Sequence, residues 1–299
     1  MTNTGVAQPP VPPPCDALHF LKVGRVRVLP RYAVVLQHNG LTTFSSAFQF
    51  TGGESLDKPG LAGWRQRHRV ILRDLSDDPH TVYLKRYVRP PIGQQFRRMF
   101  RGRPRDSTAG QEWRTITRLA AAGIPVPAPV AFGQEMRGWF ERRSFLLLEA
   151  VAGTSLESWM PENWQRCAAR ETACRQHDFV RRLARHVAAL HAAGFVHRDL
   201  YASHIFVRHD EGFTFIDLQR VFRPRWRRTR WVIKDLAALS FSTAAFAAPT
   251  DRLRFWKEYV RAVRRERWFR ALPARIEAKA QRIRQHDARR LARHQGHTP

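Results

Sequence analysis

Two aspartates constrain the fold of this chain more than any other feature of its sequence. Asp199 ends the triplet His197-Arg198-Asp199, which follows a long amphipathic segment, and Asp217 stands in an apolar run further along. The segment between them has the length of a β-hairpin, which would bring both carboxylates to one side of a cleft. Phosphoryl transfer needs such a pair, because one carboxylate accepts the proton of the attacking hydroxyl and another holds magnesium on the phosphates. We therefore predict Asp199 as the catalytic base and Asp217 as a magnesium ligand.

A lysine in a predicted strand supplies the third element of this chemistry. Lys85 stands in the middle of the strand-like run Thr81–Val88. A lysine at a strand position that faces a cleft can hold the α- and β-phosphates of a nucleotide. Such a lysine needs a carboxylate to fix its rotamer. Glu112, near the start of the next predicted helix, is the expected partner, and Glu135 and Glu141 in later loops are weaker alternatives.

The predicted elements run from a β-rich first half, with one helix, to a helical second half. A basic loop spans residues 89–105, and Thr108 is the expected N-cap of the helix, with Gln111 completing a capping box and Gly123 ending it. The expected strands are Val26–Leu29, Tyr32–Leu36, Phe44–Phe50, Arg67–Leu72, Thr81–Val88, Ser144–Val151 and Thr214–Leu218.

The second half has the periodicity of helices. Phe179, Leu183, Val187 and Leu190 form one apolar stripe, and a polar, arginine-rich helix is expected over Pro273–Gln295. We therefore predict an α+β fold with three parts. These are a disordered proline-rich arm at 1–17, an ATP-binding N-lobe at 18–150 and a catalytic C-lobe at 151–299.

Together these residues resemble the protein-kinase superfold, and in detail they are most similar to the Kdo/WaaP lipopolysaccharide-kinase family. Members of that family phosphorylate inner-core sugars of lipopolysaccharide. The resemblance covers roughly residues 45–245. The segments that carry it are His197-Arg198-Asp199-Leu200-Tyr201-x-x-His204, Ile216-Asp217-Leu218-x-Arg220 and Lys234-Asp235-Leu236-Ala237-Ala238-Leu239.

The resemblance implies ATP and Mg²⁺ as cofactors. It implies a hinge between the lobes at Glu149–Val151, where backbone groups of Glu149 and Val151 hold adenine. It also implies a loop over the phosphates, which we assign to the glycine-rich segment that begins at Gly52 and Gly53. His204 stands where protein kinases place a magnesium-binding asparagine. Magnesium prefers oxygen ligands, but the family pattern tolerates histidine, so we assign His204 as a second candidate metal ligand.

Several structural roles and departures also follow from the resemblance. Asp235 is expected to brace the backbone of the catalytic loop, Arg198 to bond backbone carbonyls and His197 to pack beneath the loop. Leu218-Gln219 replaces the usual Phe-Gly after the metal aspartate, and no Ala-Pro-Glu follows. The glycine joint on which protein-kinase switching relies is therefore missing, and we expect no peptide-binding activation segment. The histidine at 204 favours the sugar-kinase branch of the superfold.

The net charge of +27 predicts an anionic partner. Nucleic acid, an anionic membrane face and a phosphorylated glycolipid all fit that charge. Arginines cluster at 97–105 and 223–230, where Trp226 and Trp231 are interleaved with them. These clusters either form ordinary solvated surface or face an anionic partner. That partner is a layer of headgroups, at which indole rings sit well, or equally nucleic acid, on whose bases aromatic rings stack.

We predict an ATP-dependent kinase that phosphorylates a sugar of the lipopolysaccharide inner core, heptose in preference to Kdo. The alternatives are another small-molecule or protein kinase of the same fold, or a basic pseudokinase that binds nucleic acid or membrane. No apolar run approaches the ~20 residues of a membrane span, and the N-terminus lacks a signal-peptide pattern. We expect a cytoplasmic protein, peripheral at the inner membrane, whose partners are core glycolipid and the anionic membrane surface rather than nucleic acid. The sequence leaves the oligomeric state open.

Overall fold

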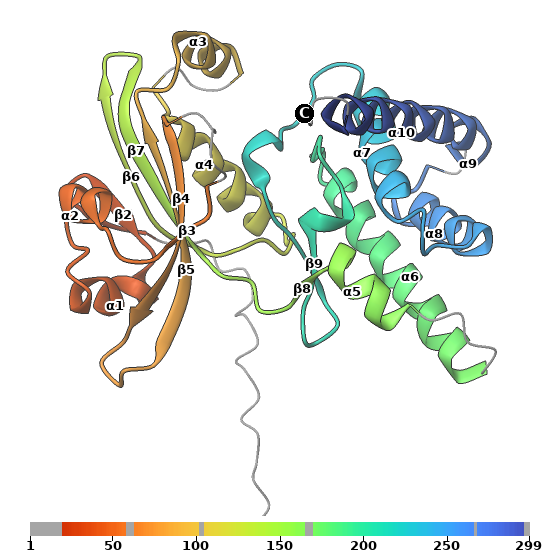
Figure 1. Cartoon of the computed structure of the whole chain (residues 1–299), viewed down its shortest axis with the longest axis horizontal. Coiled ribbons are helices and arrows are strands. Elements are labelled where there is room, and N and C mark those ends of the chain that lie inside the picture. Colours follow the sequence, from red (N-terminus) through yellow and green to blue (C-terminus); the bar gives the residue numbers. More distant parts are fainter. Residues whose placement is uncertain (1–19, 58–62, 102–104, 165–169, 266–267, 296–299) are drawn as a thin grey trace, which may run out of the picture.

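The computed structural model describes residues 20–57, 63–101, 105–164, 170–265 and 268–295, and its elements form two lobes (Figure 1). The first lobe is built on a seven-stranded sheet, and the second combines helices with a three-stranded sheet. This is the two-lobed α+β arrangement that the order of elements predicts. The arm expected at residues 1–17 lies outside the described residues.

The sheet of the first lobe is antiparallel, in the order β1-β2-β6-β7-β5-β4-β3. Lys85 lies on β5, next to the middle strand β7, where it pairs with Leu146. Because β5 pairs with β4 on one side and with β7 on the other, the backbone at Lys85 is fixed from both sides. The strands are β1 (Leu21–Val23), β2 (Val26–Val28), β3 (Glu54–Ser55), β4 (Arg65–Arg73), β5 (Pro79–Val88), β6 (Pro129–Arg137) and β7 (Phe140–Glu149).

Two segments that we expected as strands, Tyr32–Leu36 and Phe44–Phe50, are wholly or largely helical. Pro30 occupies the first turn of the earlier helix, where its fixed φ suits helix initiation. Thr43 caps the later one and forms a capping box with Ser46. These start signals outweigh the β propensity of the valine and phenylalanine side chains. The helices are η1 (Pro30–Tyr32), α1 (Ala33–His38) and α2 (Phe44–Gln49).

The basic segment 89–105 was expected as a loop, yet it contains helix α3 (Ile92–Arg101). The buried contacts of this helix are polar. Gln95 accepts a hydrogen bond from the Glu141 amide at 2.8 Å, and its own amide donates to Pro90 O at 2.8 Å. Apolar periodicity gives no signal for a helix that is held in this way.

Helix α4 (Thr108–Ala121) is the predicted helix, with a different cap. Ser107 is the N-cap, and its hydroxyl accepts from Gly110 N at 2.9 Å. The Thr108 hydroxyl instead donates to Glu141 Oε2 at 2.7 Å, so the predicted capping box at Thr108 is wrong. Gly123 follows the helix end at φ +71°, a conformation that suits glycine.

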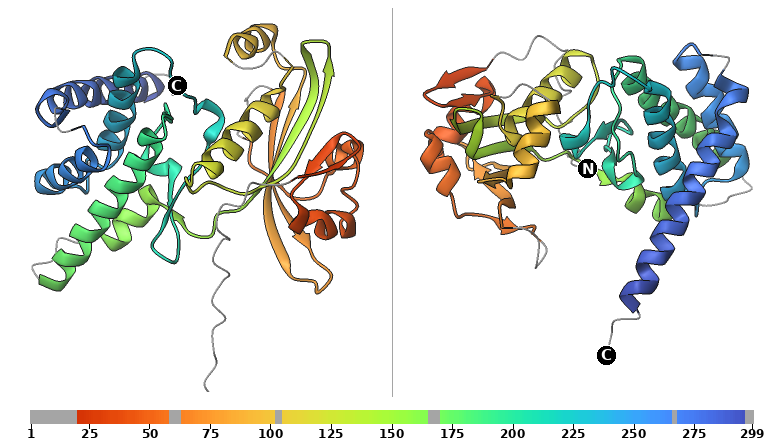
Figure 2. Two further views of the ribbon diagram at one scale, coloured as in Figure 1. Left: turned by 180° about the vertical axis from the view of Figure 1, so that it is seen from behind. Right: turned by 90° about the horizontal axis from the view of Figure 1, so that it is seen from above.

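The second lobe begins where the chain leaves β7. The three-stranded sheet lies next to α5 and α6, and α7 to α10 pack beyond them (Figures 1 and 2). The predicted strand Thr214–Leu218 ends at Phe215, because Asp217 adopts a left-handed conformation that turns the chain. The elements are β8 (Thr154–Ser155), α5 (Leu156–Asn163), α6 (Arg170–Ala192), η2 (Ala202–His204), β9 (Ile205–Val207), β10 (Phe213–Phe215), η3 (Leu218–Arg220), α7 (Arg228–Ser242), α8 (Pro249–Ala262), α9 (Trp268–Ala271) and α10 (Pro273–Gln295).

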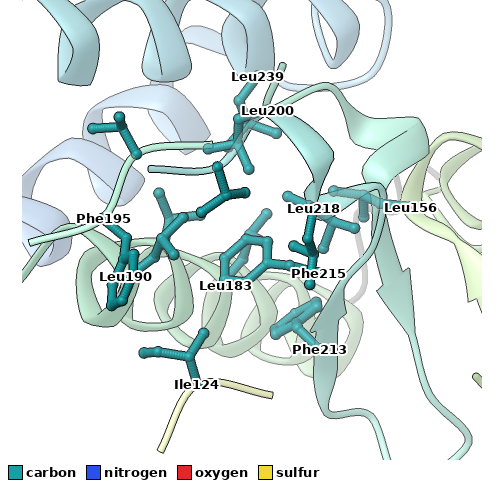
Figure 3. Packing of buried hydrophobic residues seen from close by; sticks show 14 of the residues in the cluster. Ile124, Leu156, Leu183, Leu190, Phe195, Leu200, Phe213, Phe215, Leu218 and Leu239 are labelled. Carbon is teal, nitrogen blue, oxygen red and sulfur yellow. The ribbon is translucent and has the colours of Figure 1, made fainter. Parts of the chain in front are cut away.

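One apolar core joins the lobes. The predicted stripe on α6 is buried, and Figure 3 shows Leu183 near Phe215 and Leu218, and Leu190 beside Phe195. The same cluster includes Trp113 of α4 in the first lobe. The site residues that both lobes contribute therefore stand on a continuous packed base. Among the described residues, no helix is long and apolar enough to cross a membrane.

Candidate active site

The ion pair expected in the first lobe is present. Lys85 Nζ lies 2.6 Å from Glu112 Oε1, and both side chains are largely buried. Glu135 is bonded to Arg143 at 2.9 Å, and Glu141 is buried against the α4 start. Of the three carboxylates considered for Lys85, the structure selects Glu112. The role of this pair in holding a nucleotide stays a prediction.

A buried tyrosine extends the ion pair toward the second lobe. Burial raises the pKa of Tyr87 well above its usual value, so the phenol stays protonated. Its hydroxyl lies 3.5 Å from Glu112 Oε2 and accepts a hydrogen bond from Gln219 Nε2. Gln219 lies in η3, two residues after Asp217. A chain of polar contacts therefore connects Lys85 with the turn that carries the predicted metal ligand.

Asp235 braces the catalytic loop, as expected. It is fully buried on α7, and its two oxygens accept from His197 N at 2.6 Å and Arg198 N at 2.7 Å. Arg198 has φ +73°, a conformation that costs a non-glycine residue on the order of 1–3 kcal/mol. Two bonds from one buried carboxylate stabilise this strained backbone directly before Asp199.

Asp199 is paired with two cationic side chains to which the sequence patterns assign no role. Arg220 Nη1 lies 3.0 Å from Asp199 Oδ1 and 2.8 Å from Oδ2. Lys234 Nζ lies 3.4 Å from Asp199 Oδ1 and donates to the Arg198 carbonyl. Burial lowers the pKa of Lys234, while the Asp199 charge opposes that change. Both residues belong to motifs that carry the family resemblance, and this was the signal that could have identified them.

His204 lies between the backbone of the predicted base Asp199 and the carboxylate of the predicted metal ligand Asp217. Its Nδ1 lies 2.7 Å from Asp199 O, and because a carbonyl only accepts, Nδ1 carries the proton. In the neutral ring the Nε2 lone pair then faces Asp217 Oδ2, which lies 3.8 Å away. Asp217 has φ +55°, so this contact also stands on a strained backbone.

These residues fit a magnesium ion that arrives with a nucleotide. Asp217 offers a carboxylate and His204 an imidazole nitrogen, and no group of three or more His, Cys, Asp or Glu among the described residues forms a metal cage. Magnesium is typically held by one or two carboxylates together with substrate phosphates and water. The donor set on the protein is therefore incomplete without the phosphates, as expected for a kinase.

His197 packs beneath the loop, as predicted. It is fully buried, and its Nε2 lies 3.0 Å from Ile216 O, to which it donates. Burial lowers the pKa of this imidazole, which keeps it neutral. The bond ties the catalytic loop to the residue before Asp217.

The predicted phosphate-loop glycines lie just before β3, and the predicted hinge lies at the end of β7. Gly52 and Gly53 precede β3, and a side chain on Gly53, at φ +109°, would clash with the Arg69 carbonyl. They are not in the turn between β3 and β4, of which 58–62 lie outside the described residues. Glu149 ends β7, where its carboxylate is bonded to Arg31 at 2.7 Å and its backbone N–H donates to Ala128 O at 2.9 Å. Its carbonyl and the backbone of Val151 therefore stay the predicted adenine contacts.

The predicted arginine clusters are only partly available to a ligand. In the first cluster, Arg98 is buried and donates to Trp139 O at 2.7 Å, so it does not face headgroups. The side chains of Arg97, Arg101 and Arg103 lie outside the described set. In the second, Trp231 is half-buried and packs against Phe222 and Arg198, whereas Trp226 is exposed. The predicted interfacial role of this cluster therefore stays a prediction that Trp226 carries.

Comparison with known proteins decides the family. The profile of the lipopolysaccharide kinase (Kdo/WaaP) family matches residues 66–259, which contain the residues of the candidate site from Lys85 to Asp235. The chain belongs to the lipopolysaccharide kinase (Kdo/WaaP) family. The match spans both lobes. Because the family and the chain's relatives within it are kinases, the chain is a phosphotransferase.

Individual relatives agree with this family assignment. Lipopolysaccharide core heptose(I) kinase WaaP of Pseudomonas aeruginosa is 32% identical over 185 residues, which are 58% of this chain and 68% of that protein. WaaP of Escherichia coli is 32% identical over 194 residues, 61% of this chain and 72% of that protein. A solved structure described as WaaP in complex with acyl carrier protein superposes with a TM-score of 0.60 at 25% identity, over 83% of this chain and 95% of that one.

Proposed function

We propose that this protein transfers the γ-phosphate of ATP to a heptose hydroxyl of the lipopolysaccharide inner core. The observation that carries the proposal is one assembly of side chains within the family match. In it, His204 contacts both Asp199 and Asp217, and the Lys85–Glu112 pair is connected to the same turn. The relatives named as heptose(I) kinases support heptose over Kdo as the acceptor.

Each site residue has a distinct task in the proposed mechanism. Asp199 accepts the proton of the acceptor hydroxyl, and the bracing by Asp235 holds it in place. Lys85, oriented by Glu112, holds the α- and β-phosphates of ATP. Arg220 and Lys234 stand beside Asp199, where their charge favours the negative phosphoryl group that must approach the base.

Magnesium would be held by Asp217 with His204 beside it. When bound, it supplies charge neutralisation on the phosphates. The protein contributes the fixed position of its ligands. His197 ties the loop to Ile216, and Gln219 ties the turn to Tyr87.

The acceptor fits a protein that works at a membrane surface. A core glycolipid is an amphiphile that resides in a bilayer, and the net charge of +27 favours approach to anionic lipid. We therefore propose a peripheral position at the cytoplasmic face of the inner membrane, with ATP as the phosphate donor.

Mass spectrometry of core oligosaccharide tests this function. Cells with and without the gene are compared, and cells that carry only the Asp199→Asn variant are the control. We expect one phosphoryl group on a heptose to depend on the active gene. Loss of phosphate from Kdo, or no loss at all, would contradict the proposed acceptor.

A second proposal concerns a protein partner, because the solved relative is described in complex with acyl carrier protein. We propose that this chain binds one too. A cavity of about 520 Å³ in the second lobe has an apolar lining that includes Met160, Phe179, Leu239, Trp256 and Ile276, and it suits the acyl group of such a carrier. Gel filtration with acylated and unacylated carrier tests this, and we expect co-elution with the acylated form. Absence of co-elution would remove the partner and leave the kinase assignment intact.

A further inference from the structure

Helix α3 of the first lobe buries two polar side chains and exposes two apolar ones. Gln95 and Arg98 are buried, whereas Ile92 and Phe96 are 67% and 48% exposed. Residues 92 and 96 are one turn apart and share a face, and residues 95 and 98 share another. A surface helix ordinarily does the opposite, so the outward apolar face needs an explanation.

Polar bonds hold the helix in this orientation. Gln95 accepts from the Glu141 amide at 2.8 Å, and Arg98 donates to Trp139 O at 2.7 Å. Arg98 also donates to the carbonyl of Asp106. These bonds fix α3 against the turn between β6 and β7 and keep Ile92 and Phe96 in solvent.

The same turn adds two exposed aromatic side chains to the apolar face. Trp139 is 58% exposed and Phe140 is 44% exposed. Because Arg98 bonds the carbonyl of Trp139, these rings belong to the same end of the lobe as α3, as Figure 1 also shows. We refer to Ile92, Phe96, Trp139 and Phe140 as the apolar tip.

Positive charge surrounds the apolar tip. Among the side chains that the structure describes in residues 89–101, 105–106 and 137–142, the exposed basic ones are Arg89, Arg105, Arg137 and Arg142. In the same segments no acidic residue is exposed, since Glu141 is buried and Asp106 is paired with Arg114 at 2.5 Å. Apolar and aromatic side chains ringed by arginines match an anionic bilayer interface.

The opposite end of the β4–β5 hairpin has the reverse character. Its turn carries Asp74, Asp77 and Asp78 around Leu75, which is highly exposed. An exposed leucine among carboxylates has no attraction to anionic lipid. Leu75 is therefore the matched control for the apolar tip.

The second lobe presents a similar feature at the same edge of the molecule. Trp226 is 83% exposed in the segment that leads into α7, and Arg225 and Arg227 flank it in exposed positions. Figure 1 and the left view of Figure 2 place this segment and α3 at one edge, one on each lobe. Contact through both lobes would hold the catalytic residues between them in a fixed orientation to the surface.

We propose that the apolar tip and the Trp226 segment form the face with which this protein lies on an anionic lipid bilayer. The benefit for catalysis rests on the proposed function, because it assumes an acceptor embedded in that bilayer. The lipid contact itself does not depend on the reaction. Each basic residue near an anionic surface strengthens binding by roughly fivefold, and the aromatic rings add burial at headgroup depth.

Vesicle sedimentation tests the lipid contact without nucleotide or acceptor. The full-length protein is mixed with vesicles of phosphatidylcholine alone or with added phosphatidylglycerol. We expect wild type to prefer the anionic vesicles, Ile92→Ser/Trp139→Ser to bind them about tenfold less and Leu75→Ser to match wild type. Melting curves check that each variant folds. Trp226→Ser, on the other lobe, is an independent variant that we also expect to bind the anionic vesicles less than wild type does. Equal binding of wild type to both vesicles, or equal binding of the tip variants and Leu75→Ser, would overturn the proposal.

Two further measurements separate this proposal from the proposed kinase function and from the proposed binding of acyl carrier protein. We expect Ile92→Ser/Trp139→Ser to phosphorylate a soluble, delipidated core oligosaccharide as fast as wild type does. We expect the same variant to phosphorylate the glycolipid in anionic vesicles more slowly than wild type does. If wild type phosphorylates neither acceptor, the proposed function fails while the vesicle result stands. If the tip variants lose acyl carrier protein and keep vesicle binding, the face docks a protein and the lipid proposal is overturned.

Discussion

At the residue scale, the site depends on a few charges held by buried partners. Asp199 is preceded by a strained residue that Asp235 braces, and Asp199 itself is paired with Arg220 and Lys234. The aspartates and Lys85 could be predicted from sequence because phosphoryl transfer demands their chemistry at a recognisable spacing. Arg220 and Lys234 stand in the motifs of the family resemblance, but their pairing with Asp199 could not be predicted, because only the folded loop brings these side chains together.

Replacing the base tests the assigned role of Asp199. We expect Asp199→Ala to lower turnover by at least ~100-fold, since general acid–base catalysis contributes roughly 10²–10⁴-fold. The melting temperature should change little because the bracing by Asp235 acts on backbone groups. Steady-state kinetics with ATP and acceptor measure this, and turnover within about threefold of wild type would contradict the role.

His204 separates a metal contact from a packing role. Asparagine offers magnesium an oxygen, so His204→Asn should keep substantial turnover, whereas His204→Leu should lose nearly all of it. The comparison is made at several magnesium concentrations. Similar turnover of the two variants would show that the side chain at this position does not serve the metal.

At the element scale, sequence patterns predicted what apolar periodicity controls. The stripe on α6 follows the 3.6-residue period of a helix, and the strands β4 and β5 follow the alternation of buried and exposed positions. Helix α3 was missed because its buried face is polar, and α2 because its capping box at Thr43 outweighs β propensity. Gly52 and Gly53 were assigned to a phosphate loop from composition alone, which carries no information on where β3 begins.

The polar link between the lobes is testable through Gln219. Removing its amide in Gln219→Leu frees the metal turn from Tyr87 and from the Lys85–Glu112 pair. We expect a rise of several-fold in the KM for ATP and a fall in kcat, while Gln219→Asn or Tyr87→Phe should have intermediate effects. A melting curve controls for stability, and unchanged kinetics in Gln219→Leu would show that the link has no positional role.

A buried histidine on α6 should make the fold sensitive to acid. Burial lowers the pKa of His186 to about 3, and its ring stacks on Phe215 with centroids 4.1 Å apart. In the unfolded chain the pKa is about 6.5, so the unfolded state binds a proton first as pH falls. Stability is full above pH ~6.5 and is lost progressively toward pH ~3, with about 2 kcal/mol lost at pH ~5.

His186→Phe should remove that part of the acid sensitivity. Urea unfolding at pH 7 and pH 5 measures the free energy of unfolding for both proteins. We expect the difference between the two pH values to shrink by about 2 kcal/mol in the variant. An unchanged difference would mean that the buried imidazole does not control acid stability.

At the scale of the whole molecule, the two lobes divide the work of the proposed reaction. The first supplies Lys85 and Glu112, the second Asp199, Asp217 and His204, and neither set suffices alone. The division at residues 150 and 151 remains a proposal that rests on the end of the large sheet at Glu149. Because the metal donors are incomplete without phosphates, nucleotide and metal should bind together.

Thermal shift assays measure that coupling. Magnesium alone should hardly move the melting temperature, while magnesium with ATP should raise it, since a ligand at about 100 times its Kd stabilises by roughly 2.7 kcal/mol. Asp217→Asn should lose the contribution of magnesium and keep a weaker effect of ATP. An equal shift by magnesium alone would point to a complete metal site that the described residues do not form.

The most direct measurement is transfer of phosphate by the purified protein. Labelled ATP and magnesium are supplied with a core glycolipid that carries heptose and Kdo, and the products are mapped by mass spectrometry. The proposed function predicts one labelled phosphoryl group on heptose with wild type, and at least ~100-fold less with Asp199→Asn. Label on Kdo would contradict the acceptor, and label that persists in Asp199→Asn would contradict the site.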